Sequence, residues 1–203
     1  ILPVKRVKQL ADVEKIDIYK LPKLKTGISK LDKILCGGLH FGQVVIIAGK
    51  RGQGKSTWGS EIITNAIEQG YKCFVYSGEM PNYLYKSWMD FQIAGPKFIV
   101  ENTNPDGTLN RFVTNTNAEL ISNWYRDKCY IYDNSFIDDE EENLVKTIEN
   151  VVMQYGIRVI LIDNLMTALD LNEDRNTDKY DKQSRFVKKL AKISLRFDLI
   201  ILL

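Results

Sequence analysis

The stretch that most restricts the fold of this chain is GKRGQGKST, residues 49–57, which directly follows the apolar run at residues 44–48. It satisfies the pattern G-x-x-x-x-G-K-[S/T], and a helical pattern follows it. Glycines in such a loop let backbone N–H groups converge on phosphate oxygens, and the N-terminus of the next helix adds its dipole. The sequence therefore predicts a phosphate-binding loop, although a glycine turn that only caps a helix would contain the same residue types.

The residues of this loop have separate expected roles. Lys55 would neutralise the β and γ phosphates, and Ser56 would supply an oxygen ligand to Mg²⁺. Lys50 and Arg51 either contact phosphates or are solvated, and the sequence leaves both open. The nucleotide-binding set that we expect is Gly49, Lys50, Arg51, Gly52, Gln53, Gly54, Lys55, Ser56 and Thr57.

Two acidic residues follow apolar runs further along the chain. Asp163 ends the run at residues 159–162, at the strand end where α/β sheets bind ligands, so it is the candidate to hold a water on Mg²⁺. Glu79 follows the run at residues 73–76, and its carboxylate could accept a proton from an attacking water. The alternatives are a helix-capping role for Asp163 and a surface role for Glu79 before Pro81.

Apolar runs of strand length alternate with helical patterns along the chain. Continuous Val, Ile and Leu runs joined by helices predict a mostly parallel sheet that is covered on both faces. The polar stretches 101–117 and 170–182 are expected to be an exposed excursion and a loop. The apolar runs lie at residues 44–48, 73–76, 129–132, 159–162 and 199–203, and the helical patterns at 28–35, 55–69, 82–94, 117–126, 143–155 and 181–196.

Composition indicates a globular protein. With 203 residues, 44% of them hydrophobic, the chain can bury one substantial core, and a net charge of +2 does not by itself indicate a nucleic-acid partner. Residues 1–33 hold nine Lys or Arg against four Asp or Glu, which fits a solvated basic linker or an arm that contacts nucleic acid. No apolar run approaches the roughly 18 residues of a membrane span, so we expect no membrane partner.

The cysteines and the chain ends lead to further expectations. Cys36, Cys73 and Cys129 form no CxxC pair, which favours buried, reduced thiols in a cytosol-like compartment over a zinc site. Apolar residues at helical spacing predict a short amphipathic helix over residues 4–20. The chain starts without methionine and stops inside an apolar run, so we expect a fragment.

Four stretches, taken in order, resemble the RecA-like motor domain of DnaB-type replicative helicases, a family that includes Twinkle and phage primase-helicases. They are TGISKLDKILCGGLHFG (26–42), GKRGQGKST (49–57), YSGEM (76–80) and VILIDNL (159–165). The resemblance implies an α/β, RecA-like P-loop NTPase fold with a mostly parallel central sheet and helices on both faces. It divides the chain into a linker helix that packs on a neighbouring subunit, residues 1–21, and an ATPase domain, residues 22–203, that is truncated at its C-terminus.

The resemblance also implies a function. It predicts a motor that uses ATP and Mg²⁺ to move along single-stranded DNA and unwind duplex, in which Glu79 is the catalytic base and Lys55 assists. The family acts as a homo-oligomeric ring, usually a hexamer, sometimes with a primase or a primase domain. The loop after Asp163 lies toward the DNA, so we expect DNA contacts from Asn172, Arg175 and Lys179.

The resemblance sets limits as well. The family's γ-phosphate sensor and arginine finger fall beyond Leu203, so we expect the fragment to bind nucleotide but to hydrolyse it slowly. We expect the protein in the cytoplasm, which would be that of a bacterial host if a phage encodes the protein. If the protein is similar to Twinkle, we expect it in the mitochondrial matrix.

Other functions remain open at this stage. A RadA-like or KaiC-like ATPase also contains SGE and GKST. A non-hydrolysing, nucleotide-gated module that loads a partner onto DNA would need the same phosphate-binding loop. A small-molecule kinase is disfavoured because the TGISKLD lead-in has no role in one.

Overall fold

The computed structural model describes residues 7–134, 143–170 and 179–203. Its centre is a five-stranded parallel sheet with the strand order β3-β9-β8-β4-β7. Each strand coincides with an apolar run in the sequence, so the predicted parallel sheet is confirmed. The strands are β3 (Gln43–Val45), β4 (Cys73–Ser77), β7 (Cys129–Ile131), β8 (Val159–Asp163) and β9 (Ile200–Leu202).

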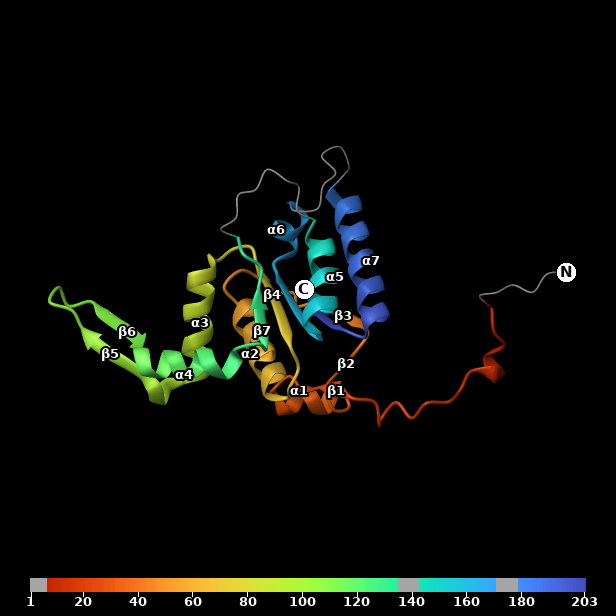
Figure 1. Cartoon of the computed structure of the whole chain (residues 1–203), viewed down its shortest axis with the longest axis horizontal. Helices are drawn as coiled ribbons and strands as arrows, with labels where there is room; N and C mark the ends of the chain where they lie inside the picture. Colours follow the sequence, from red (N-terminus) through yellow and green to blue (C-terminus); the bar gives the residue numbers. More distant parts are fainter. Residues whose placement is uncertain (1–6, 135–142, 171–178) are drawn as a thin grey trace.

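Helices cover both faces of this sheet (Figure 1). All six predicted helices within residues 28–196 are present. Short α6 is additional and follows β8 almost directly. The helices are α1 (Ser29–Ile34), α2 (Lys55–Glu68), α3 (Asn82–Ala94), α4 (Asn115–Tyr125), α5 (Leu144–Tyr155), α6 (Leu165–Asp170) and α7 (Lys179–Phe197).

The two faces of the sheet form two hydrophobic clusters. Side chains alternate along a strand, so Phe74 and Ile160 pack with α5, α6 and α7, while Val75 and Leu161 pack with α2 and α3. Nearly all the strand side chains of β4, β8 and β9 are buried. Burial on both faces explains why these strands read as unbroken apolar runs.

Residues 101–117, the expected exposed excursion, are largely part of a regular structure over residues 99–113. They form an antiparallel hairpin of β5 (Ile99–Thr103) and β6 (Leu109–Val113), which follows the 3₁₀ turn η2 (Pro96–Phe98) and projects from the body (Figure 1). The turn is stabilised by the Asp106 carboxylate, which accepts hydrogen bonds from the amide and hydroxyl of Thr108 at 2.9 and 2.7 Å. The prediction of exposure is confirmed, but the polar composition hid the strand pairing.

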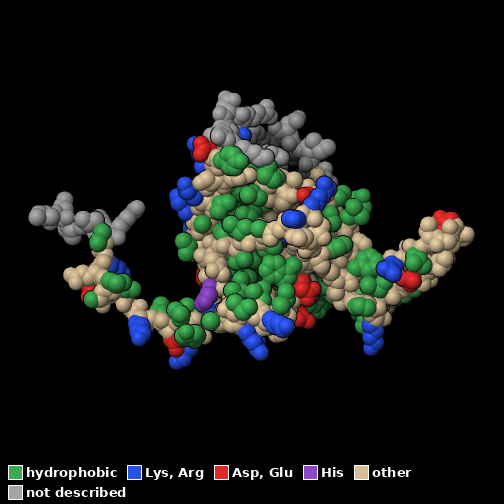
Figure 2. Space-filling model, turned by 180° about the vertical axis from the view of Figure 1, so that it is seen from behind, with side chains coloured by type: hydrophobic (Ala, Val, Ile, Leu, Met, Phe, Trp, Pro, Cys, Tyr) green, Lys and Arg blue, Asp and Glu red, His purple; other side chains and the backbone are tan. Residues whose placement is uncertain are grey.

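The predicted N-terminal helix is wrong for the part of it that the structure describes. Residues 7–20 contain only the 3₁₀ turn η1 (Leu10–Asp12), and every residue from 7 to 22 is exposed. An isolated short helix is marginal in water, and among the described residues none covers the apolar side chains of this segment. This N-terminal arm and the β5–β6 hairpin extend from opposite sides of the body (Figure 2).

The remaining elements connect the arm to the sheet. Strands β1 (Lys23–Leu24) and β2 (Leu39–His40) pair antiparallel and enclose α1. Within the described ranges, no helix is long and apolar enough to cross a membrane.

Candidate functional site

The predicted phosphate-binding loop lies between β3 and α2. Gly52 and Gly54 have φ angles of 79° and 77°, a left-handed backbone that side chains rarely allow. A Cβ built on Gly52 would meet nothing within 4 Å, so its backbone angle, not crowding, requires glycine. The Lys50 amide closes the loop by donating to Gln53 Oε1 at 2.9 Å.

The Lys55 side chain folds back over this loop. Its Nζ donates to the carbonyl oxygens of Gly49 and Lys50 at 2.9 and 3.0 Å. No side chain caps the N-terminus of α2, and its first turn has no acidic residue. The first amides of α2 are therefore available to an anion, with the lysine ammonium beside them. Ser56 is half-buried in this turn, while Arg51 and Thr57 are exposed.

Close packing links α2 to β8. A Cβ built on Gly59 would lie 2.9 Å from Leu161 Cδ1, so this glycine lets the helix approach the strand. Leu161 lies two residues before Asp163, whose carboxylate leaves the sheet at the end of β8. The contact thus fixes the distance between the loop and the acidic strand end.

Lys55 and Asp163 line the same cleft, of about 220 Å³. The cleft lies at the C-terminal edge of the sheet and is otherwise mainly apolar. The two predicted side chains therefore lie at the edge where parallel α/β sheets bind ligands. The other lining residues are Ile46, Ile47, Leu161, Ile162, Asn164, Leu165, Val187 and Leu203.

Glu79 lies beside this cleft, in the turn after β4. Strands β4 and β8 are neighbours, with Ser77 in register with Asp163. The Gly78 amide donates to the Asp163 carbonyl at 2.6 Å, and Asn164 Nδ2 donates to Glu79 Oε1. The exposed Glu79 carboxylate is therefore tied to the residue that follows Asp163.

Sequence reasoning missed Asn164 and Gly78 in this site. Asn164 Oδ1 also accepts hydrogen bonds from the amides of Met166 and Thr167, at 2.9 and 3.2 Å, at the start of α6. Asparagine before a helix is a known capping signal, but α6 itself was not predicted. The sequence has no signal for the contact between Asn164 and Glu79, because these residues are 85 positions apart.

The TGISKLD lead-in has a structural role away from the cleft. The amide and hydroxyl of Thr26 both donate to Asp32 Oδ1 at 2.8 Å. Gln69, at the far end of α2, exchanges two hydrogen bonds with the backbone of Lys25, at 2.9 and 3.0 Å. Lys25, directly before the lead-in, therefore connects this segment to the end of α2 opposite to the glycine-rich loop.

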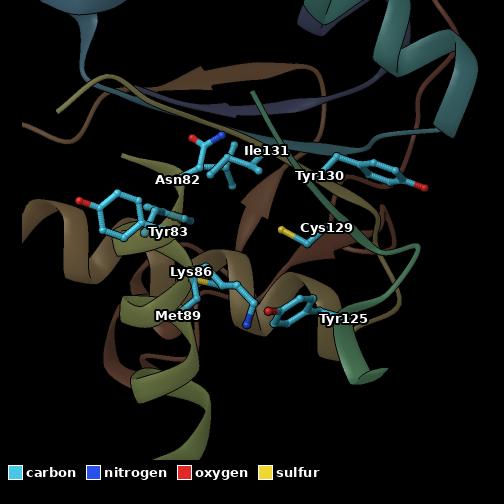
Figure 3. A pocket seen from close by; sticks show the side chains of 10 residues that line it. Asn82, Tyr83, Lys86, Met89, Tyr125, Cys129, Tyr130 and Ile131 are labelled. Carbon is cyan, nitrogen blue, oxygen red and sulfur yellow. The ribbon is translucent and has the colours of Figure 1, made fainter. Parts of the chain in front are cut away.

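A second cavity, of about 330 Å³, lies beside the edge strand β7 (Figure 3). It is almost entirely apolar, with Tyr83 and Met89 from α3 facing Tyr125 and Ile131 across it. None of the predicted nucleotide-binding residues lines this cavity, so it is a separate feature of the surface.

The cysteines only partly match expectation. Cys73 is buried, and burial raises the pKa of its thiol and raises that of Cys129 to about 12. Both thiols are therefore protonated and unreactive at neutral pH. Cys36 is exposed, so the expectation that all three are buried is wrong. It follows α1 at a positive φ of 52°, where the chain turns toward β2.

The predicted DNA contacts are beyond what the structure describes. Asn172 and Arg175 lie outside the described residues. Lys179 begins α7, but its side chain is not among those described.

A parallel sheet with a glycine-rich loop before a helix, and acidic residues after two neighbouring strands, defines a P-loop NTPase of the RecA-like class. The family model for the DnaB-like helicase C terminal domain matches residues 23–202. The chain belongs to this family of RecA-type ATPases, which implies the use of a nucleotide and Mg²⁺.

Short segments of this chain are similar in sequence to other proteins. DNA repair protein RadA from Campylobacter jejuni is 37% identical over 67 residues, which cover 33% of this chain and 15% of the relative. RadA from Mycolicibacterium smegmatis is 43% identical over 54 residues, which cover 27% of this chain and 12% of that relative. The matched segment thus spans less than a sixth of either relative.

A solved structure supports the fold. A KaiC-like protein from the archaeon Pyrococcus horikoshii matches with a TM-score of 0.61 and 19% identity, covering 90% of this chain and 70% of that chain. At this level of identity the likeness concerns the fold alone.

Proposed function

We propose that this chain is the ATP-hydrolysing motor domain of a replicative DNA helicase, which couples hydrolysis to movement along single-stranded DNA and to duplex unwinding. Family membership supports the proposal. The observation that carries it is the arrangement at the sheet edge, where Lys55 and Asp163 line one cleft and Glu79 is tied to Asn164 beside Asp163.

Phosphate binding would begin with Lys55. Its ammonium group already lies over the loop, held by two carbonyl oxygens, and turns to the β and γ phosphates when a nucleotide binds. The uncapped amides of α2 and the loop amides from residue 49 to residue 54 would hold the phosphate oxygens. Gln53, which closes the loop, keeps these amides in place.

The metal ligands would be the Ser56 hydroxyl and Asp163. Both are hard oxygen donors, as Mg²⁺ prefers, and they lie on α2 and β8, which pack against each other through Gly59. A bound Mg²⁺ would offset the charge that develops on the β and γ phosphates.

Glu79 would act as general base. As a water oxygen bonds to the γ phosphorus and the bond to the β–γ bridging oxygen breaks, the carboxylate takes the water's proton, and ADP and phosphate leave. Asp163 would instead hold the Mg²⁺ and a water bound to it.

The motor would work as a homo-oligomeric ring, with a hexamer as the expected form and a primase as a candidate partner. The exposed arm supports an intersubunit contact, because apolar side chains without cover favour burial against a partner. The apolar cavity beside β7 is the surface we propose for the arm of a second copy. The exposed apolar side chains of the arm are Val7, Leu10, Val13, Ile16, Ile18, Tyr19 and Leu21.

Single-stranded DNA would contact the ring through Asn172, Arg175 and Lys179, as the family resemblance implies. Their substitution by alanine should weaken DNA binding while nucleotide binding stays unchanged, because the proposed nucleotide contacts come from residues 49–57, Glu79 and Asp163.

The test is steady-state ATP hydrolysis by the intact protein with and without single-stranded DNA, followed by strand displacement from a forked duplex. We expect DNA to stimulate hydrolysis, and Glu79→Gln to lower kcat by at least about a hundredfold while nucleotide binding remains. Hydrolysis without any effect of DNA, or a Glu79→Gln variant with full activity, would contradict the proposal.

A RadA-like role is the second candidate, because short stretches of the chain match DNA repair protein RadA. A DNA-stimulated ATPase that does not separate duplex strands would favour it. A third outcome, nucleotide-dependent DNA binding without hydrolysis, would indicate a loading module.

A further inference from the structure

Asn164 uses both ends of its side-chain amide. Its Oδ1 accepts hydrogen bonds from two backbone amides of α6, Met166 and Thr167, and its Nδ2 donates to Glu79 Oε1. In the flipped orientation, Nδ2 would face two N–H donors and Oδ1 would face a carboxylate. The start of α6 therefore fixes which end of the amide points to Glu79.

Glu79 needs such a partner. It is exposed, and a free glutamate side chain samples many rotamers. The backbone around it is already fixed, since the Gly78 amide donates to the Asp163 carbonyl at 2.6 Å and Asn134 Nδ2 donates to the Ser77 carbonyl at 2.6 Å. What remains free is the side chain, and Asn164 holds one of its two oxygens.

We propose that Asn164 is a positioning residue for hydrolysis, which holds Glu79 Oε1 so that Oε2 faces the attacking water. This rests on the proposed role of Glu79 as base. Because Asn164 directly follows Asp163, the same strand end places the metal ligand and orients the base. In this role the amide acts through the glutamate and takes no direct part in the reaction.

Asn164→Asp separates the two functions of this side chain. Aspartate caps a helix as well as asparagine does, so it keeps the bonds to Met166 and Thr167, but it cannot donate to Glu79. Asn164→Ala removes both the cap and the donor. If Asn164 only stabilised α6, Asn164→Asp would behave as wild type and Asn164→Ala would be the impaired variant.

Our proposal predicts that Asn164→Asp is at least as impaired in hydrolysis as Asn164→Ala. In the intact protein, kcat of Asn164→Asp falls at least about tenfold, with KM for ATP and thermal stability near wild type, because misplaced reacting groups lose rate rather than affinity. The loss of kcat in Asn164→Asp equals or exceeds the loss in Asn164→Ala, since the new aspartate carboxylate faces the carboxylate of Glu79. Asn123→Asp, an exposed change of the same charge on α4, keeps wild-type kcat.

A double-mutant cycle completes the test. In the Glu79→Gln background, Asn164→Asp should lower kcat by less than about twofold, because the base it positions is already absent. Equal losses in both backgrounds, or a wild-type kcat for Asn164→Asp, would overturn the positioning role. A wild-type protein that binds ATP without hydrolysing it would instead overturn the proposed function, and the positioning role with it.

Discussion

Gly78 has no room for a side chain, because a Cβ at this position would overlap Oγ1 and Cβ of Thr167 in α6. The turn after β4 thus lies directly on the helix that follows β8. This contact keeps Glu79 beside the end of the strand that carries Asp163, and glycine is required here for space rather than for its backbone angle.

Gly78→Ala should therefore lower both stability and hydrolysis. We expect a loss of about 1–3 kcal/mol in the free energy of unfolding, as for other overpacked sites, and a lower kcat because α6 and Glu79 shift. Urea denaturation and steady-state kinetics measure the two effects. In Gly78→Ala/Thr167→Ala, which removes the overlapping hydroxyl, part of the loss should be recovered, and no recovery would contradict the steric explanation.

Asp32 should be important for stability alone. Asp32→Ala leaves the amide and hydroxyl of the fully buried Thr26 without their acceptor, so we expect a loss of about 2–3 kcal/mol. Asp32→Asn keeps an oxygen acceptor for Thr26, so it should lose less stability than Asp32→Ala. Thermal denaturation checks the order of the variants, and nucleotide affinity should stay unchanged, since the contact lies at the far end of α2 from the cleft. Equal stability of Asp32→Ala and wild type would contradict this role.

The buried thiols predict a loss of stability at alkaline pH. The pKa of Cys129 is about 12 in the folded chain against an ordinary value of 9.0, and burial also raises the pKa of Cys73. The unfolded chain releases these protons first, so stability is full below pH 9 and falls as the pH rises toward 12. The slope approaches about 1.4 kcal/mol per pH unit for each thiol. Unfolding measured across this range should show a smaller slope in Cys129→Ala, and an unchanged slope would contradict the assignment.

The exposed arm predicts a change in assembly. Removal of residues 1–21 should shift the protein from the proposed ring toward monomers in sedimentation velocity experiments. Each subunit would then lose the apolar arm that packs on its neighbour. Ile16→Ser with Ile18→Ser should weaken assembly in the same direction, while Lys15→Ser, a polar change in the same arm, should not. An intact ring without the arm would show that other surfaces hold the subunits together.

The sequence predicted the sheet well because the strands β4, β8 and β9 are buried on both faces. Val159 to Ile162, for example, are all buried, so the strand appears as one apolar run with a carboxylate at its end. The turn at residues 49–54 was equally clear, because left-handed backbone at Gly52 and Gly54 requires glycine at those positions. Local chemistry was sufficient in both cases.

The remaining features depend on contacts between distant residues. The arm has helical spacing, yet the part of the chain that the structure describes does not bury it, so periodicity alone gave the wrong structure. The need for glycine at 78 and the hydrogen bond between Asn164 and Glu79 exist only after β4 and β8 become neighbours. The short α6 was missed because its six residues are too few to show a helical period and follow β8 after only one residue.

The most direct test of the account is calorimetric binding of a non-hydrolysable ATP analogue with Mg²⁺. We expect wild type and Glu79→Gln to bind alike, and Lys55→Ala to lose at least about tenfold in affinity, because its ammonium no longer meets the β and γ phosphates. No binding by wild type, or equal binding by Lys55→Ala, would contradict the claim that residues 49–57 form a nucleotide site.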